Sequence, residues 1–122
     1  MTGDLGYVLA TLIGVFSLFL SARALLQPLP AAVGFGVPAT SGLRPYMAIK
    51  GGRDLAVGVL LLSLIATADR QAIGVAVLAA TAIPLVDGTI VLRSGGPRAT
   101  AFGVHYGSAA IMLVAAVLLL VG

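Results

Sequence analysis

Four long apolar stretches limit what this chain of 122 residues can fold into. They cover about residues 5–26, 45–67, 71–92 and 100–121. Each is long enough for a helix across a hydrocarbon core of about 30 Å, which takes about 20 residues, and the mean hydropathy is +1.15. Backbone polar groups in lipid must be paired internally, so the spans must be helical. We predict an all-α fold, a four-transmembrane-helix antiparallel bundle in which residues 1–122 form a single transmembrane domain.

Proline, glycine and polar residues separate the predicted spans. Pro28 and Pro30 end the first span, because proline cannot continue a helix. Residues 27–44 are rich in proline and glycine and are predicted to be a loop that lies partly on the membrane surface. Asp69 and Arg70 form a tight polar hinge, and residues 93–99 form the last turn.

The basic residues predict the orientation of the bundle. Arg70 alone lies at one face, and the others lie at or toward the opposite face: Arg23, Arg44, Lys50, Arg53, Arg93 and Arg98. The positive-inside rule makes the loops 27–44 and 93–99 cytoplasmic and places both termini outside. We expect an integral membrane protein, of the bacterial inner membrane, whose first span is retained because no basic flank precedes it.

Composition excludes several functions. The chain is 60% apolar, and its seven basic residues are not interleaved with aromatic residues, so nucleic acid is not an expected partner. With no cysteine and one histidine, neither a metal site nor a cofactor is expected. The expected partners are the lipid bilayer and a lipophilic small molecule. The pairs Gly103 with Gly107 and Gly52 with Ala56 also suit close helix packing and allow a homo-oligomer.

Ionisable residues of three spans are expected to share one layer of the bundle. Counted at about 1.5 Å per residue, Lys50, Arg53, Asp54, Asp87 and His105 all lie roughly five to nine residues from the cytoplasmic edge. A charge within a span costs about 2.5–3.5 kcal/mol unless it finds a partner or water. We therefore predict a polar pocket below an apolar outer half. The proline at position 84 interrupts the third span beside it.

This layer suits acid–base chemistry. We predict Asp87 and His105 as a proton-transfer pair, with Arg53 holding a developing oxyanion or orienting Asp54. The remaining polar side chains near the layer are candidate ligand-binding residues: Lys50, Tyr46, Arg23 and Tyr106.

A structural interpretation of the same residues stays open. Lys50 can extend to the headgroups, and Arg53 can form an ion pair with Asp54 or Asp87 that only fixes the register of the helices. His105 can be an interior histidine that donates to Asp87 or to a backbone carbonyl. The number of ionisable groups at one depth exceeds what a small bundle needs, and this excess favours a functional site.

Two functions fit such a pocket. The first is an acid–base enzyme that isomerises, cyclises or opens an epoxide of a lipophilic small molecule from the bilayer. The second is a non-catalytic lipid- or quinone-binding protein or an accessory subunit of a membrane complex. Transport ranks last, because no polar residue lines the outer half.

A family resemblance supports the same residues. The patterns are Tyr46-x-x-x-Lys50-Gly51-x-Arg53-Asp54-x-x-x-Gly58, then Pro84-x-x-Asp87, then Gly95-Gly96-x-x-x-Ala101-x-x-x-His105. Over nearly its whole length, the chain resembles a family of small four-helix bacterial and fungal membrane proteins catalogued as a domain of unknown function. In size and layout it is distantly similar to DoxX-like proteins, some of which are subunits of quinone-linked membrane oxidoreductases. The resemblance implies that Lys50, Arg53, Asp54, Asp87 and His105 belong to the family pattern.

Overall fold

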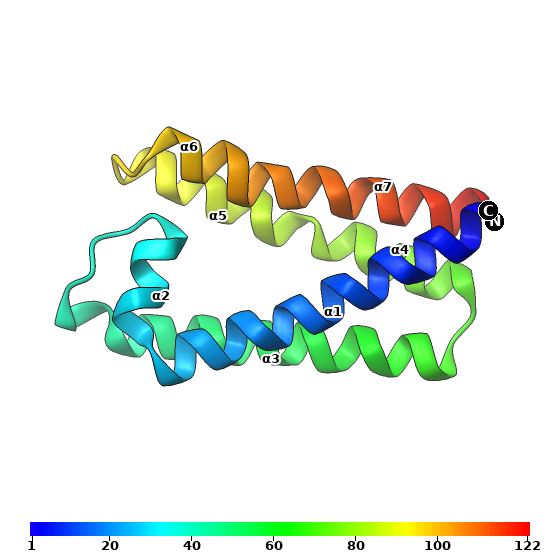
Figure 1. Ribbon diagram of the computed structural model, residues 1–122, viewed down its shortest axis with the longest axis horizontal. Coiled ribbons are helices and arrows are strands. Elements are labelled where there is room, and N and C mark those ends of the chain that lie inside the picture. The colour runs from blue at the N-terminus through cyan, green and yellow to red at the C-terminus, as the bar shows by residue number, and fades with distance from the viewer.

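The computed structural model describes residues 1–122, and it is all-α. Helix α1 (Thr2–Leu26) lies along α3 (Arg44–Thr67). Helices α4 (Arg70–Ala80) and α5 (Ala82–Arg93) form one arm of a second pair, and the other arm contains α6 (Arg98–Thr100), the π-helical η2 (Ala101–Tyr106) and α7 (Gly107–Val121). Both termini and the α3–α4 hinge lie at one end of the molecule, and the α5–α6 turn lies at the other (Figure 1).

Three of these helical segments are long and apolar enough to cross a membrane. They are Thr2–Leu26, Arg70–Arg93 and Arg98–Val121. Helix α3 is 24 residues long, but it includes Lys50, Arg53 and Asp54. The helices occupy the four predicted stretches, and the all-α class is confirmed.

The segment predicted as a loop contains a helix. Helix α2 (Pro28–Phe35) begins after Gln27 and is followed by the short 3-10 turn η1 (Ser41–Leu43). Proline is tolerated in a first helical turn because the N–H that it lacks would be unpaired there, and Gly36 ends the helix with φ 102°. Helix α2 lies between the α1–α3 pair and the α5–α6 arm (Figure 1), so the chain turns back into the molecule here.

The third predicted span is broken at Thr81, between α4 and α5. The proline ring nitrogen of Pro84 cannot donate to the carbonyl of Ala80, so the regular ladder is interrupted. The Thr81 hydroxyl donates to the carbonyl of Val77 at 2.9 Å, which pairs this buried side chain. Ala80 and Pro84 both line the main cavity, so the break lies at the pocket wall, as the sequence predicted.

Small residues bring α1 and α3 close together, although not at the predicted positions. A Cβ on Gly58 would lie 2.7 Å from Leu18 Cδ2 and 3.0 Å from the carbonyl oxygen of Gly14. Gly52 and Gly103 would meet nothing within 4 Å. The two predicted pairs therefore do not pack helices within the chain, because these faces point away from the neighbouring helices.

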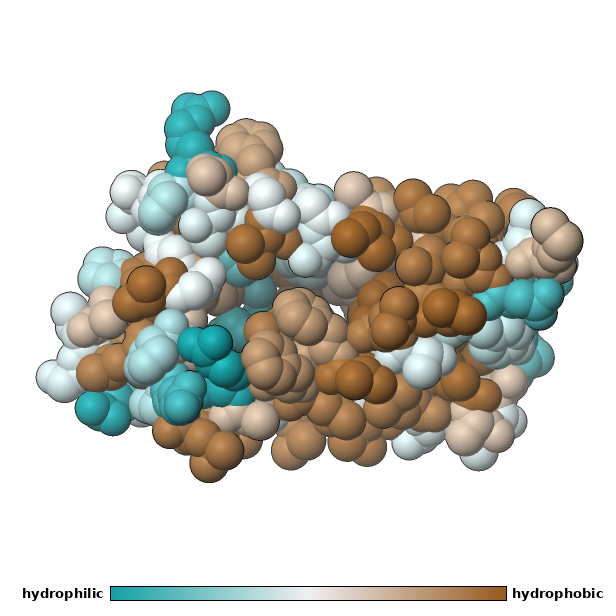
Figure 2. Space-filling view, viewed as in Figure 1, coloured by the Kyte–Doolittle hydropathy of each residue, from teal (hydrophilic) through white to brown (hydrophobic).

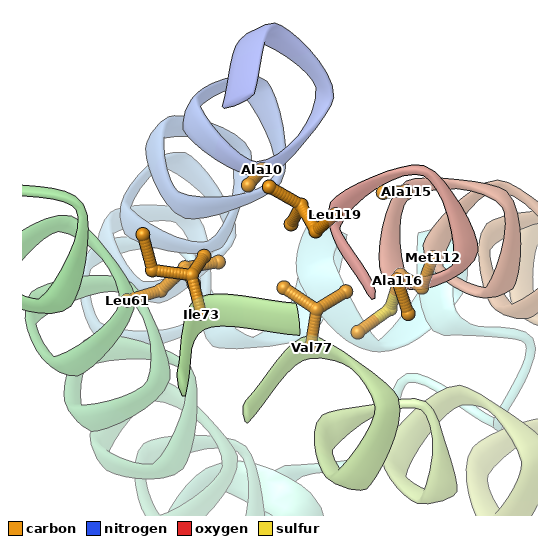
Figure 3. Close-up of a cluster of buried hydrophobic side chains, with 8 residues drawn as sticks. All are labelled: Ala10, Leu61, Ile73, Val77, Met112, Ala115, Ala116 and Leu119. Atoms are coloured by element: carbon orange, nitrogen blue, oxygen red, sulfur yellow. The ribbon is translucent and has the colours of Figure 1, made fainter. Parts of the chain in front are cut away.

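The apolar core lies toward the end with the termini. Eight buried residues from α1, α3, α4 and α7 form it (Figure 3): Ala10, Leu61, Ile73, Val77, Met112, Ala115, Ala116 and Leu119. Alanines on α7 let these helices approach closely, and the larger side chains fill the space between them. This packing leaves the charged layer in the other half of the molecule.

Candidate functional site

Four charged side chains of α3 and α5 form one ion-paired network. Arg53 reaches Asp87 with both terminal nitrogens, Nη1 to Oδ1 at 3.1 Å and Nη2 to Oδ2 at 2.9 Å. Its Nη2 also lies 3.3 Å from Asp54 Oδ1, and Lys50 Nζ donates to Asp54 Oδ2. Asp54 and Asp87 are buried, so each carboxylate is compensated by a cation.

The contact between Arg53 and Asp87 is the interhelical ion pair that the structural interpretation of the sequence described. A bidentate arginine–carboxylate contact has a fixed planar geometry, so it sets the position of α3 relative to α5. The two cations and two anions of the network cancel in formal charge. Lys50 pairs with Asp54 within the bundle, so its charge is compensated without contact to a lipid headgroup.

His105 is fixed by a backbone carbonyl, the partner that the structural interpretation allowed, and not by Asp87, its partner in the predicted proton-transfer pair. Its Nε2 lies 2.7 Å from the carbonyl oxygen of Phe35, and no hydrogen bond joins it to Asp87. A carbonyl only accepts hydrogen bonds, so Nε2 donates, and in the neutral form of this ring Nδ1 is the unprotonated nitrogen. Nδ1 makes no hydrogen bond to the protein. The predicted Asp87–His105 pair is therefore not formed: His105 Nε2 is at the Phe35 carbonyl, and Asp87 accepts from Arg53.

Phe35, at the end of α2, was missed by the sequence analysis. Its carbonyl is one of the last in the helix, where no intrahelical donor follows, and His105 supplies that donor. Its ring lies 4.6 Å from the His105 ring between centroids, and Lys50 Nζ is 5.6 Å from its centroid. A short helix flanked by Pro28 and Gly36 was the available signal for an ordered segment here.

His105 lies within the π-helical segment η2, which the sequence also did not predict. Such segments contain an extra residue per turn and frequently occur at functional sites. The Tyr106 hydroxyl lies 2.9 Å from Thr89 Oγ1, and its ring packs where a Cβ of Gly88 would be. Tyr106 thus joins η2 to α5 outside the cavity.

A cavity of about 630 Å³ lies over this network. Its polar lining includes Arg23, Lys50, Arg53, Asp54, Asp87 and His105. Its apolar walls come mainly from α1, with Leu12 and Phe16, and from α7, with Ile111 and Met112. Figure 2 shows a hollow bordered by hydrophobic surface, with hydrophilic atoms inside it.

The remaining predicted ligand-binding residues divide between the cavity and the surface. Arg23 lines the cavity from the last turn of α1. Tyr46 is 66% exposed and does not line it. Tyr46 shares a helix face with Lys50 and Asp54, but it lies in the first turn of α3, beyond the residues that line the cavity. Tyr46 and Tyr106 are therefore not hydroxyl donors to this cavity.

A family model for a domain of unknown function, DUF4267, matches residues 14–119. The chain belongs to this family. The match covers the network, His105 and the cavity lining from residue 14 onward, and it confirms the resemblance noted in the sequence. No curated protein and no solved structure matches the chain.

Proposed function

We propose that this member of the DUF4267 family binds a lipophilic small molecule that enters its cavity from the bilayer. The supporting observation is the cavity itself, in which apolar walls adjoin an ionisable floor. A volume of about 630 Å³ lies within the usual range of small-molecule sites, about 300–1,000 Å³. Phe16 and Leu12 line the cavity and are also more than half exposed, so the wall continues onto the lipid-facing surface of α1.

The polar floor would select the ligand. Lipid tails are as apolar as the cavity walls, so transfer of a hydrocarbon tail from bilayer to cavity gains little. A polar group of the ligand, in contrast, is costly in hydrocarbon and favourable beside Arg23 or the free Nδ1 of His105. The ligand is therefore a molecule with one polar end and an apolar body.

A substitution that fills the cavity with a larger side chain tests this proposal. Ser108 lines the cavity and donates to the carbonyl four residues earlier, and Ser63 makes the same contact on the exposed face of α3. We expect Ser108→Phe to abolish labelling of α1 and α7 by a photoactivatable long-chain alcohol, with Ser63→Phe labelled like wild type. Mass spectrometry of the labelled peptides measures this. Equal labelling of the two variants would exclude the cavity as the site.

We also propose that α3 crosses the bilayer, which completes a four-transmembrane-helix bundle. Its charged side chains are paired within the bundle, and this pairing lowers the cost of placing them in lipid. By the positive-inside rule, the loops 27–44 and 93–99 are cytoplasmic and both termini lie outside, in a membrane such as the bacterial inner membrane.

Labelling of single cysteines tests the crossing of α3, since the natural chain has no cysteine. Ala39→Cys and Gln71→Cys place exposed thiols on either side of α3. We expect an impermeant maleimide to label Gln71→Cys in intact cells and Ala39→Cys only after permeabilisation. Labelling of both from the same side would place α3 outside the membrane core.

Acid–base catalysis is a second candidate, and the free Nδ1 of His105 favours it. With Nε2 held by the Phe35 carbonyl, Nδ1 is the one basic atom in the polar lining without a hydrogen bond or cationic partner. A base in this position can remove a proton next to a carbonyl of the ligand, forming an N–H bond as the C–H bond breaks.

Hydrogen exchange tests His105 as a base. We expect the protein in deuterated buffer to exchange the protons beside the carbonyl of 2-tridecanone, as measured by mass spectrometry. His105→Gln retains a donor for the Phe35 carbonyl and removes the base, so exchange should fall to the uncatalysed rate. Exchange at the wild-type rate in this variant would reject His105 as the base.

A further inference from the structure

The charges that line the cavity do not balance. Three cationic side chains, Arg23, Lys50 and Arg53, face two carboxylates, Asp54 and Asp87. Lys50 pairs with Asp54, and Arg53 pairs with Asp87. Arg23 makes no ion pair, and it leaves one positive charge in excess with His105 neutral.

Arg23 also contains an unused hydrogen-bond donor. Its Nε is buried and has no partner. A guanidinium stays charged under all conditions relevant to proteins, so Arg23 cannot escape this cost by losing a proton. The C-terminal dipole of α1 offsets at most about half an elementary charge.

We propose that the cavity takes a lipophilic monoanion, whose oxyanion group pairs with Arg23 and whose hydrocarbon part lies between α1 and α7. This inference rests on the proposed binding function and names its ligand class. A carboxylate or phosphate oxygen only accepts hydrogen bonds, so it matches the donors of Arg23 and not the unprotonated Nδ1 of His105. Bound there, the anion cancels the excess charge and satisfies the buried Nε.

The sequence predicted that Arg53 would hold an oxyanion and that Lys50 would bind the ligand. Both are engaged by buried carboxylates, and an anion at either would compete with Asp54 or Asp87. Arg23 lies on a different helix from both carboxylates and has no such competitor. The oxyanion therefore belongs at the end of the cavity beside the last turn of α1.

Competition between matched lipids tests the ligand class. The full chain in phosphatidylcholine nanodiscs is labelled with the photoactivatable alcohol, and oleate or oleyl alcohol is added at alkaline pH, where the oleate carboxyl is ionised. A hydrogen bond to a charged group contributes about 1.5–3 kcal/mol, so oleate should compete about 10- to 100-fold better than oleyl alcohol. Equal competition by the two lipids in wild-type protein, together with no competition by phosphatidylglycerol, would overturn the inference.

Variants locate the anion. Arg23→Gln should remove the advantage of oleate and leave competition by oleyl alcohol unchanged, and Arg23→Lys should retain part of the advantage. Arg44→Gln, an exposed arginine at the same end that does not line the cavity, is the matched control and should behave like wild type. An advantage of oleate that survives in Arg23→Gln would overturn the assignment to Arg23.

Two further outcomes identify the source of the oxyanion and separate this inference from the proposed function. Competition by phosphatidylglycerol without competition by oleate would support the anion class and assign it to a phospholipid phosphate. If the photoactivatable alcohol failed to label α1 and α7 of the wild-type protein when no competitor was added, the cavity would be rejected as a binding site.

Discussion

The two ends of the molecule use the same helices in opposite ways. Near the termini, α1 and α7 touch, and a Cβ on Gly6 would lie 2.8 Å from Leu119 Cγ. Toward the other end both helices line the cavity, α1 with Leu12 and Phe16 and α7 with Ile111 and Met112. The bundle is thus closed where small residues allow contact, and it is open where ionisable side chains gather. Substitutions at the two ends test this division.

The largest effect is expected at the open end, from Arg53→Gln. This change leaves Asp87 buried without its cation, and breaking a buried ion pair costs about 3–5 kcal/mol. We expect a loss of this size in the free energy of unfolding, measured by titration with denaturant in detergent. The double variant Arg53→Gln with Asp87→Asn should be more stable than the single one. Equal stability of the two would show that the pair is not buried in the folded protein.

At the closed end, Leu119→Ala should cost about 2–5 kcal/mol, because it leaves a cavity in a packed core. Leu12→Ala removes the same side chain from the cavity wall, where Leu12 is 59% exposed, and should cost less than about 0.5 kcal/mol. Thermal unfolding of both variants measures the difference. Similar losses would mean that the two ends are equally well packed.

Close packing of α1 against α3 is tested by two glycines of α3. Gly58→Ala should cost about 1–3 kcal/mol, since its Cβ would meet Leu18 and the backbone of Gly14. A Cβ at position 52 would meet nothing within 4 Å, so Gly52→Ala should stabilise the helix by up to about 1 kcal/mol. The same unfolding assay compares them. A neutral Gly58→Ala would show that the two helices separate easily.

A small loss of stability and no change in ligand binding are expected for Tyr106→Phe. It removes the hydrogen bond to Thr89 and should cost about 0.5–1.5 kcal/mol of stability. Competition by oleate should be unchanged, because Tyr106 does not line the cavity. A weaker competition in this variant would assign Tyr106 to the site.

The sequence predicted the all-α class and the charged layer because both follow from local rules. Apolar length determines where helices form, and the cost of a charge in lipid brings Arg53, Asp54 and Asp87 together. It did not predict which carboxylate each cation takes, because that depends on how α3 lies against α5. The predicted Asp87–His105 contact is absent because the fold places the Phe35 carbonyl beside Nε2 of His105.

The contact between Phe35 and His105 could not be predicted from the side chain of Phe35. Phenylalanine in an apolar chain is unremarkable, and the group that holds His105 is a backbone carbonyl, which every residue has. Only the return of α2 into the bundle places that carbonyl beside the ring. Arg23 was predicted as a ligand-binding residue, but its lack of a partner became visible only once the other charges were paired.

The bidentate contact between Arg53 and Asp87 also bears on how the chain enters the membrane during synthesis. The two residues are 34 positions apart, so α3 leaves the ribosome before its main counter-ion exists. Until α5 follows, Lys50 and Asp54 can pair with each other, but Arg53 keeps an uncompensated charge. We therefore expect α3 to settle in the bilayer together with the α4–α5 arm, as a hairpin, and not as a single helix inserted in its turn.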